Sequence, residues 1–213
     1  MKKLFFTIVL LITGITSLSA QEIKDVILSM PDDIILGLEA AQKELLISDP
    51  SDTTEITIDK GTYADIKRLA ISPDFISLQT SESGTTQIKL LPLINDSKII
   101  CVVKTVCTKD SVCDSRMQFY TTKWLPINQS ELFPGKDKNW FIKEGTDHNS
   151  QDFINAYTAL DMNPMKIDLS PTDNNLTITY NIKSYLSEED YKKLEPYLTE
   201  KPKILTWDKS SYK

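Results

Sequence analysis

The stretch "SKIICVVKTVCTKDSVCDSRMQFYTTKW", residues 97–124, decides how the middle of this chain folds, and it holds all three cysteines of the 213-residue sequence. Its two ends are rich in Val, Ile, Thr and aromatic residues, which favour β-strands. Between them lies the short polar loop "TKDSV", with a cysteine at each end. The pattern predicts two antiparallel strands, "KIICVVKTVC" and "RMQFYTTKWL", joined by that loop.

The three cysteines, at positions 101, 107 and 113, are interpreted from those strands. Cys101 and Cys107 would point to the same face of one strand but lie about 20 Å apart, too far for a disulfide. Cys107 and Cys113 would face each other across the hairpin, and a disulfide between them would persist in an oxidising compartment. We therefore predict a Cys107–Cys113 disulfide and an inert Cys101 thiol in the core, with a reactive Cys101 as the alternative.

The segments before these strands extend the same sheet. "FISLQTS" and "TTQIKLLPL" flank "ESG" and predict a hairpin, so residues 75–125 should form a four-stranded antiparallel meander. Residues 55–71 fit either a strand or a helix. Residues 29–47 carry apolar side chains at helical spacing and predict an amphipathic helix, with Asp32 and Asp33 in its first turn.

The second half of the chain predicts a further set of helices and strands. A helix begins after Ser150, a hairpin turns at "TDNN", a short helix follows Ser187 in "SEED", and "PKILTWD" is the last strand. Residues 128–149 are low in hydrophobicity and predict a long loop or linker.

Together these elements predict an α+β fold, an antiparallel sheet with helices packed on one face. The loop at 128–149 would separate an N-terminal α+β unit, residues 21–127, from a C-terminal one, residues 150–213. Helix, hairpin and a closing strand with a tryptophan occur twice, ending at Trp124 and Trp207. The alternatives are two similar units in tandem or one continuous domain.

The first twenty residues, "MKKLFFTIVLLITGITSLSA", have two lysines, a short apolar core and a small, polar end. This is the layout of a secretory signal peptide. Its apolar core is shorter than the roughly 20 residues of a transmembrane helix, so a retained anchor is the less favoured alternative. We predict a signal peptide at residues 1–20 and an exported chain starting at Gln21, located in the periplasm, at the cell surface or in the medium.

The composition argues against several classes of function. The net charge is −6, and −8 without Lys2 and Lys3, so nucleic-acid binding is not expected. One histidine, no C-x-x-C and no glycine-rich phosphate loop predict no metal and no cofactor. The lone His148 could serve a Cys–His pair or a serine triad, but without a G-x-S-x-G motif a solvated loop histidine is the better interpretation. We expect a protein that is not an enzyme.

Two aromatic residues, Trp140 and Phe141, stand in the otherwise polar segment "KDKNWFIKEG". If both were exposed, they would form a contact surface for a partner. The alternative is that they anchor a long loop onto the core.

Several stretches carry a resemblance to a known family: "LSMPDDIILGL", "LQTSESGTTQIKLLPL", "IICVVKTVC", "MQFYTTKWLP" and "YLTEKPKILTWDKSSY". The chain resembles a family of secreted Bacteroidetes proteins known as domain of unknown function 3256. The resemblance covers nearly the entire mature chain and implies an exported protein with no established activity, cofactor or catalytic residue. It also implies O-glycosylation at Asp-Ser/Thr-hydrophobic sites, for which Ser111 in "DSV" and Thr53 in "DTT" are candidates.

From these observations we expect a non-enzymatic binding module of the bacterial envelope that recognises a protein, a peptide or a glycan. An exposed face of the sheet, or the loop at 128–149, would be the contact region. The alternative is a hydrolase, for example a glycan-directed one, whose carboxylates come together from distant parts of the chain. An envelope scaffold or inhibitor-like partner is a third hypothesis.

Overall fold

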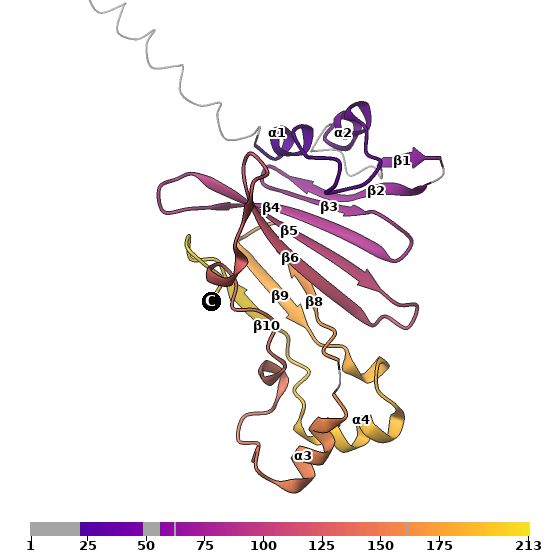
Figure 1. Ribbon diagram of the computed structural model, residues 1–213, viewed down its shortest axis with the longest axis vertical. Helices are drawn as coiled ribbons and strands as arrows, with labels where there is room; N and C mark the ends of the chain where they lie inside the picture. The colour runs from indigo at the N-terminus through magenta and orange to yellow at the C-terminus, as the bar shows by residue number, and fades with distance from the viewer. Residues whose placement is uncertain (1–21, 49–55, 62, 161) are drawn as a thin grey trace, which may run out of the picture.

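The computed structural model describes residues 22–48, 56–61, 63–160 and 162–213, so the predicted signal peptide and Thr53 lie outside the described residues. Helices α1 and α2 lie on one face of a large sheet, and a small sheet lies on its other face (Figure 1). Helices α3 and α4 lie together beyond one end of the small sheet (Figure 1). The predicted α+β class is confirmed.

The large sheet has seven strands in sequence order, each antiparallel to the next. The meander predicted at 75–125 is confirmed as β3 to β6, and the ambiguous segment before it supplies β1 and β2. The strands are β1 (Ile56–Lys60), β2 (Tyr63–Ser72), β3 (Phe75–Gln79), β4 (Gly84–Pro92), β5 (Lys98–Cys107), β6 (Cys113–Thr121) and β7 (Pro126–Ile127).

Strand β5 is apolar on both faces, and this requires a layer on each side of the sheet. All five residues of "IICVV", 99–103, are buried. Ile100 and Val102 belong to the core under α1 and α2, while Ile99, Cys101 and Val103 belong to the core against the small sheet. Successive residues of a strand face opposite sides, so the run can be buried only between two layers.

The helical layer differs from the helix predicted at 29–47. The structure has α1 (Glu22–Leu28), then a stretch of turns, then α2 (Ala40–Leu46). Gly37 in the intervening stretch has φ +72°, a left-handed conformation that interrupts a helix. The buried Lys43 ammonium donates to the Met30 carbonyl at 2.6 Å and pairs with Asp32 at 3.2 Å, so Asp32 stabilises this turn instead of a first helical turn.

The small sheet has three strands in the order β10-β9-β8: β8 (Lys166–Leu169), β9 (Asn175–Thr179) and β10 (Lys203–Thr206). The hairpin predicted at "TDNN" is confirmed as β8 and β9. The outer edge of β8 is bonded to side chains of the large sheet. The Ile167 amide donates to Ser115 Oγ at 2.8 Å, and the Leu169 amide donates to Gln87 Oε1 at 2.8 Å.

The remaining elements form the helical end of the molecule: 3₁₀ helices η2 (Gln129–Glu131), η3 (Lys138–Phe141), η4 (Ile182–Ser184) and η5 (Glu195–Tyr197), and helices α3 (Gln151–Thr158) and α4 (Glu188–Leu194). Ser150 and Ser187 cap α3 and α4 as predicted, each accepting a bond from an amide three residues on. None of the helices among the described residues is long and apolar enough to cross a membrane.

The two predicted units meet in one hydrophobic cluster. Phe119 on β6 stacks on Trp207, which follows β10, with ring centroids 6.3 Å apart. The two sheets differ in strand number and in strand order, which argues against two similar units in tandem. The boundary placed at residues 128–149 stays a prediction.

Two tryptophans attach the two outer layers to the large sheet. The Trp124 indole N–H donates to the Val26 carbonyl of α1 at 3.1 Å. The Trp207 indole N–H donates to the Pro92 carbonyl at the end of β4 at 2.7 Å. Both side chains are buried, so each bond satisfies an indole N–H group that water reaches poorly.

We predict that Trp124→Phe and Trp207→Phe each lower the free energy of unfolding by about 1–3 kcal/mol, because each removes an indole hydrogen bond and part of a buried side chain. Urea unfolding followed by circular dichroism measures the change. Trp140→Phe is the control, since Trp140 is only half-buried, and it should cost less than about 1 kcal/mol. An equal loss in all three variants would contradict the role given to the two indoles.

Candidate binding site

The cysteines lie where the sequence predicts. Cys107 and Cys113 form a disulfide that joins the last residue of β5 to the first residue of β6. Cys101 is a free thiol, fully buried between the two sheets. Burial raises the pKa of the Cys101 thiol far above its usual range, so the nucleophilic thiolate is disfavoured. The structure therefore supports the inert core thiol.

The prediction that Trp140 and Phe141 form an exposed contact pair is wrong for Phe141, which is buried. Phe141 is only 1% exposed and stacks on Tyr180, with ring centroids 5.1 Å apart. Trp140 is half-buried, and the Lys203 ammonium lies 5.7 Å from its ring centroid. The turn of η3 sends one aromatic ring inward, so this segment is anchored to the core in the way the alternative describes.

The other residues singled out from the sequence do not come together in one site. Ser111 is exposed at the tip of the β5–β6 hairpin, where its carbonyl accepts a bond from Asn181 Nδ2 at 3.2 Å. Its O-glycosylation stays a prediction, as does that of Thr53. His148 is an exposed loop residue beside the Phe153 ring, whereas Cys101 is buried between the sheets.

The glutamates of "SEED" form local pairs. Glu188 and Glu189 each pair at 2.7 Å with the lysine four residues later on α4. The two carboxyl groups with a shifted pKa, Asp173 and Asp208, are both shifted downward, mainly by hydrogen bonds that they accept. A general acid needs the opposite shift. Among the described residues, no group of three or more His, Cys, Asp or Glu side chains is placed to hold a metal ion.

A strip of polar side chains on β6 lies at the margin of the helical layer. Alternate residues of this strand face the α1 and α2 side, because their partners Ile100 and Val102 on β5 lie in the core under these helices. The helices bury β4 and β5 but leave these side chains exposed or half-buried. We call this set the β6 strip; its members are Arg116, Gln118 and Tyr120 on β6 and Thr122 in the turn that follows, and it spans up to about 20 Å.

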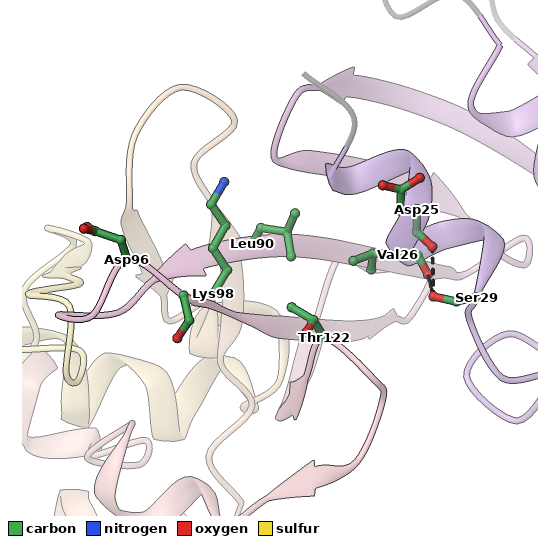
Figure 2. A pocket seen from close by; sticks show the side chains of 8 residues that line it. Asp25, Val26, Ser29, Leu90, Asp96, Lys98 and Thr122 are labelled. Atoms are coloured by element: carbon green, nitrogen blue, oxygen red, sulfur yellow. Dashed lines mark hydrogen bonds between the residues drawn. The ribbon is translucent and has the colours of Figure 1, made fainter. Parts of the chain in front are cut away.

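A pocket lies at the Thr122 end of the β6 strip, beside α1. Its volume is about 370 Å³, and we call it the α1 pocket. Figure 2 shows Lys98 on one side and Asp25 on the other, with Val26 and Leu90 between them. The pocket thus combines an apolar floor with groups of both charges; it is lined by Asp25, Val26, Ser29, Leu90, Asp96, Ser97, Lys98 and Thr122.

Exposed apolar side chains accompany each segment that lines the α1 pocket. Leu28 on α1 is 45% exposed, Ile94 in the β4–β5 turn 76%, and Leu125 after β6 62%. Each lies within three residues of a residue that lines the pocket. Exposed apolar side chains on the segments that line a pocket are a feature of binding surfaces.

A second pocket lies beside the Arg116 end of the β6 strip. Its volume is about 420 Å³, and we call it the Lys104 pocket; it is lined by Asp33, Ile34, Ile35, Leu36, Ala64, Thr80, Ser81, Thr86 and Lys104. Burial lowers the pKa of Lys104, with Asp33 opposing the shift and Arg116 adding to it. Burial and Asp33 raise the pKa of the Tyr120 hydroxyl, which donates to Gln118 Oε1 at 3.3 Å.

A third and smaller pocket lies on the β7 side of the strip. Its volume is about 260 Å³, and it is lined by Arg116, Gln118, Phe119, Tyr120, Pro126, Ile127, Asn128 and Gln129. Three members of the β6 strip therefore line a pocket on this side too. The strip is a surface with hollows on both sides and at both ends, which suits an elongated ligand more than a small compact one.

The sequence predicts an exposed face of the sheet as a contact region without singling out these residues, although a signal for them is present. In "RMQFY" polar and apolar residues alternate up to Phe119, as in a strand with one uncovered face. Aromatic residues on such a strand are commonly core residues or cross-strand partners. This holds for Phe119, which is 1% exposed, but only partly for the half-buried Tyr120.

Comparisons with known proteins identify the fold but no activity. The family model described as "Protein of unknown function (DUF3256)" matches residues 15–212. A solved structure described as a domain of an uncharacterized protein from Porphyromonas gingivalis W83 is similar, with 25% sequence identity and a TM-score of 0.79. The match covers 90% of this chain and 96% of that one. No curated protein matches.

We predict that Lys104→Met raises the free energy of unfolding by about 0.2–1 kcal/mol, because it removes a charge that burial disfavours and that faces Arg116 across the two strands; these two effects together outweigh the lost attraction of Asp33. Urea unfolding at low salt measures the change. Lys109→Met, at the exposed hairpin tip, is the control and should change the free energy by less than about 0.5 kcal/mol. A clear loss of stability in Lys104→Met would mean that Lys104 has a stabilising partner.

Proposed function

This chain belongs to the DUF3256 family, proteins of unknown function, and we propose that it is a non-enzymatic binding module of the bacterial envelope. Its contact region is the β6 strip with the pockets beside it. Its ligand is an extended segment of a protein partner. The observation that carries the proposal is the strip itself, the part of the helix-bearing face of β4 to β6 that the helices leave uncovered.

The dimensions of the strip favour an extended ligand. Arg116 on β6 and Thr122, the first residue of the following turn, are six positions apart, which corresponds to at most about 20 Å. A bound segment of about six extended residues has the same length. Its side chains would alternate between the strip and solvent, which is how an extended peptide is recognised on a sheet.

The chemistry of the pockets favours a peptide over a glycan. The α1 pocket offers Asp25, Lys98 and an apolar floor within one cavity, a mixture that matches the side chains of a polypeptide. The one aromatic residue of the β6 strip is Tyr120, and its ring packs against Trp124 at 5.4 Å. It therefore offers a sugar ring less of a flat stacking surface than a freely exposed aromatic side chain would.

The location in the envelope rests on two supporting observations. The predicted signal peptide would export the chain, and the Cys107–Cys113 disulfide is stable in the oxidising space outside the cytoplasm. The hydrolase alternative has less support, because the two shifted carboxyl groups have a lowered pKa. Export to the periplasm, the cell surface or the medium is compatible with the proposal.

The test is site-specific photo-crosslinking in the native envelope. A photo-reactive phenylalanine analogue placed at Gln118, on the strip, should crosslink to a single protein partner. The same analogue at Thr177, on the face of the small sheet turned away from the core, is the control and should give at least about tenfold less product. Mass spectrometry of the product identifies the partner.

A blocking variant sharpens the test. Thr122→Trp fills the mouth of the α1 pocket and should reduce the crosslink from position 118 by about tenfold or more, a loss of about 1.4 kcal/mol in binding. Thr177→Trp is its control and should leave the crosslink unchanged. Equal crosslinking from positions 118 and 177, or none at all from 118, would contradict the proposed function.

A further inference from the structure

Two cations face each other on the helix-bearing side of the sheet. Lys104 on β5 and Arg116 on β6 are direct partners in the antiparallel register. Their neighbours Val103 and Met117 face the small sheet, so Lys104 and Arg116 both point to the opposite side. Side chains that are paired in this way have Cβ atoms about 4.5–5.5 Å apart, close enough for their charges to repel.

Neither cation has an acidic partner among the described residues. No carboxylate of these residues lies within 4.0 Å of Lys104 or Arg116. Asp33, across the Lys104 pocket, influences the pKa of Lys104 without forming an ion pair with it. Lys104 is therefore attracted by the Asp33 carboxylate only at more than 4.0 Å.

The two buried lysines among the described residues, Lys43 and Lys89, each have an acidic partner. The Lys43 ammonium lies 3.2 Å from the Asp32 carboxylate, and the Lys89 ammonium lies 3.0 Å from that of Asp74. Lys136 pairs with Asp114. Half-buried Lys104 has no such ion pair with any described residue, and it lies at a place where the surface is hollowed on both sides.

We propose that Lys104 and Arg116 form a carboxylate-binding subsite that receives an acidic group of the bound protein segment. This inference rests on the proposed function, because it names the chemistry recognised at one end of the β6 strip. The guanidinium of Arg116 can hold both oxygens of a carboxylate, and Lys104 adds a second charge-assisted bond. The acidic group is an Asp or Glu side chain or the C-terminal carboxylate of the segment.

Other features of the site fit this ligand. The hydroxyl residues Thr80 and Ser81 line the same pocket as Lys104 and can bond a carboxylate or the peptide beside it. A bound anion would also remove the repulsion that contributes to the lowered pKa of Lys104. At the other end of the strip the α1 pocket contributes Asp25 and Asp96 with Lys98, so the surface is more positive at Arg116 and more acidic at Thr122. This difference fixes the direction of the bound segment.

The test is an NMR titration of the purified protein with small probes. N-acetyl-glutamate α-amide carries the side-chain carboxylate, and N-acetyl-glutamine amide is its neutral counterpart of the same shape. N-acetyl-glycine carries a C-terminal carboxylate. Inorganic phosphate tests for an anion of another class.

The expected result is a saturable shift of the backbone amide signals of residues 104 and 116, which every variant retains, with at least one of the two carboxylate probes, and none with the neutral amide. Lys104→Met and Arg116→Gln should each weaken that binding about fivefold or more, and added salt should weaken it as well. Lys109→Met is the matched control and should bind as the unaltered protein does. Tighter binding of one carboxylate probe identifies which kind of acidic group the subsite prefers.

Three results would overturn the subsite: equal shifts with the neutral amide, unchanged affinity in both variants, or binding of phosphate alone. These outcomes are distinct from failure of the proposed function. Crosslinking from position 118 that is unaffected by Lys104→Met or Arg116→Gln would contradict the subsite and still support the binding module. Carboxylate binding without any crosslinked partner would support the subsite and contradict the binding module.

Discussion

The structure depends on one constraint, the double-sided burial of strand β5. Five consecutive apolar residues, 99–103, cannot be buried by a single layer, because every second side chain points the other way. Helices α1 and α2 solve this on one face and the small sheet on the other. The two buried indoles attach these layers at opposite sides of the large sheet, so each tryptophan takes part in both packing and hydrogen bonding.

Local patterns were sufficient to predict β3 to β6, the disulfide and the caps at Ser150 and Ser187, because each depends on residues close in sequence. The helix predicted at 29–47 was wrong in its first part, since apolar spacing alone does not register the left-handed Gly37. The second layer could not be predicted for a different reason. The bonds that hold β8 to the large sheet join residues 52 and 82 positions apart, and no local pattern reports them.

The candidate site was predictable only in part. The alternation of Arg116, Met117, Gln118 and Phe119 indicates a strand with one polar face, but which strand remains uncovered depends on how far α1 and α2 extend over the sheet. The extent of that cover is a tertiary property. Phe141 shows the reverse case, in which a polar surrounding sequence suggested exposure and a single turn of 3₁₀ helix placed the ring in the core.

The two faces of strand β6 have different surroundings. Toward the small sheet, Ser115 bonds the edge of β8 while Met117 and Phe119 fill the core. Toward the helices, Arg116 and Gln118 touch little that the fold requires. Substitutions at these alternate positions can therefore change what the surface recognises while leaving the core intact. Related chains could diverge in specificity along one face of a single strand and still inherit the same architecture.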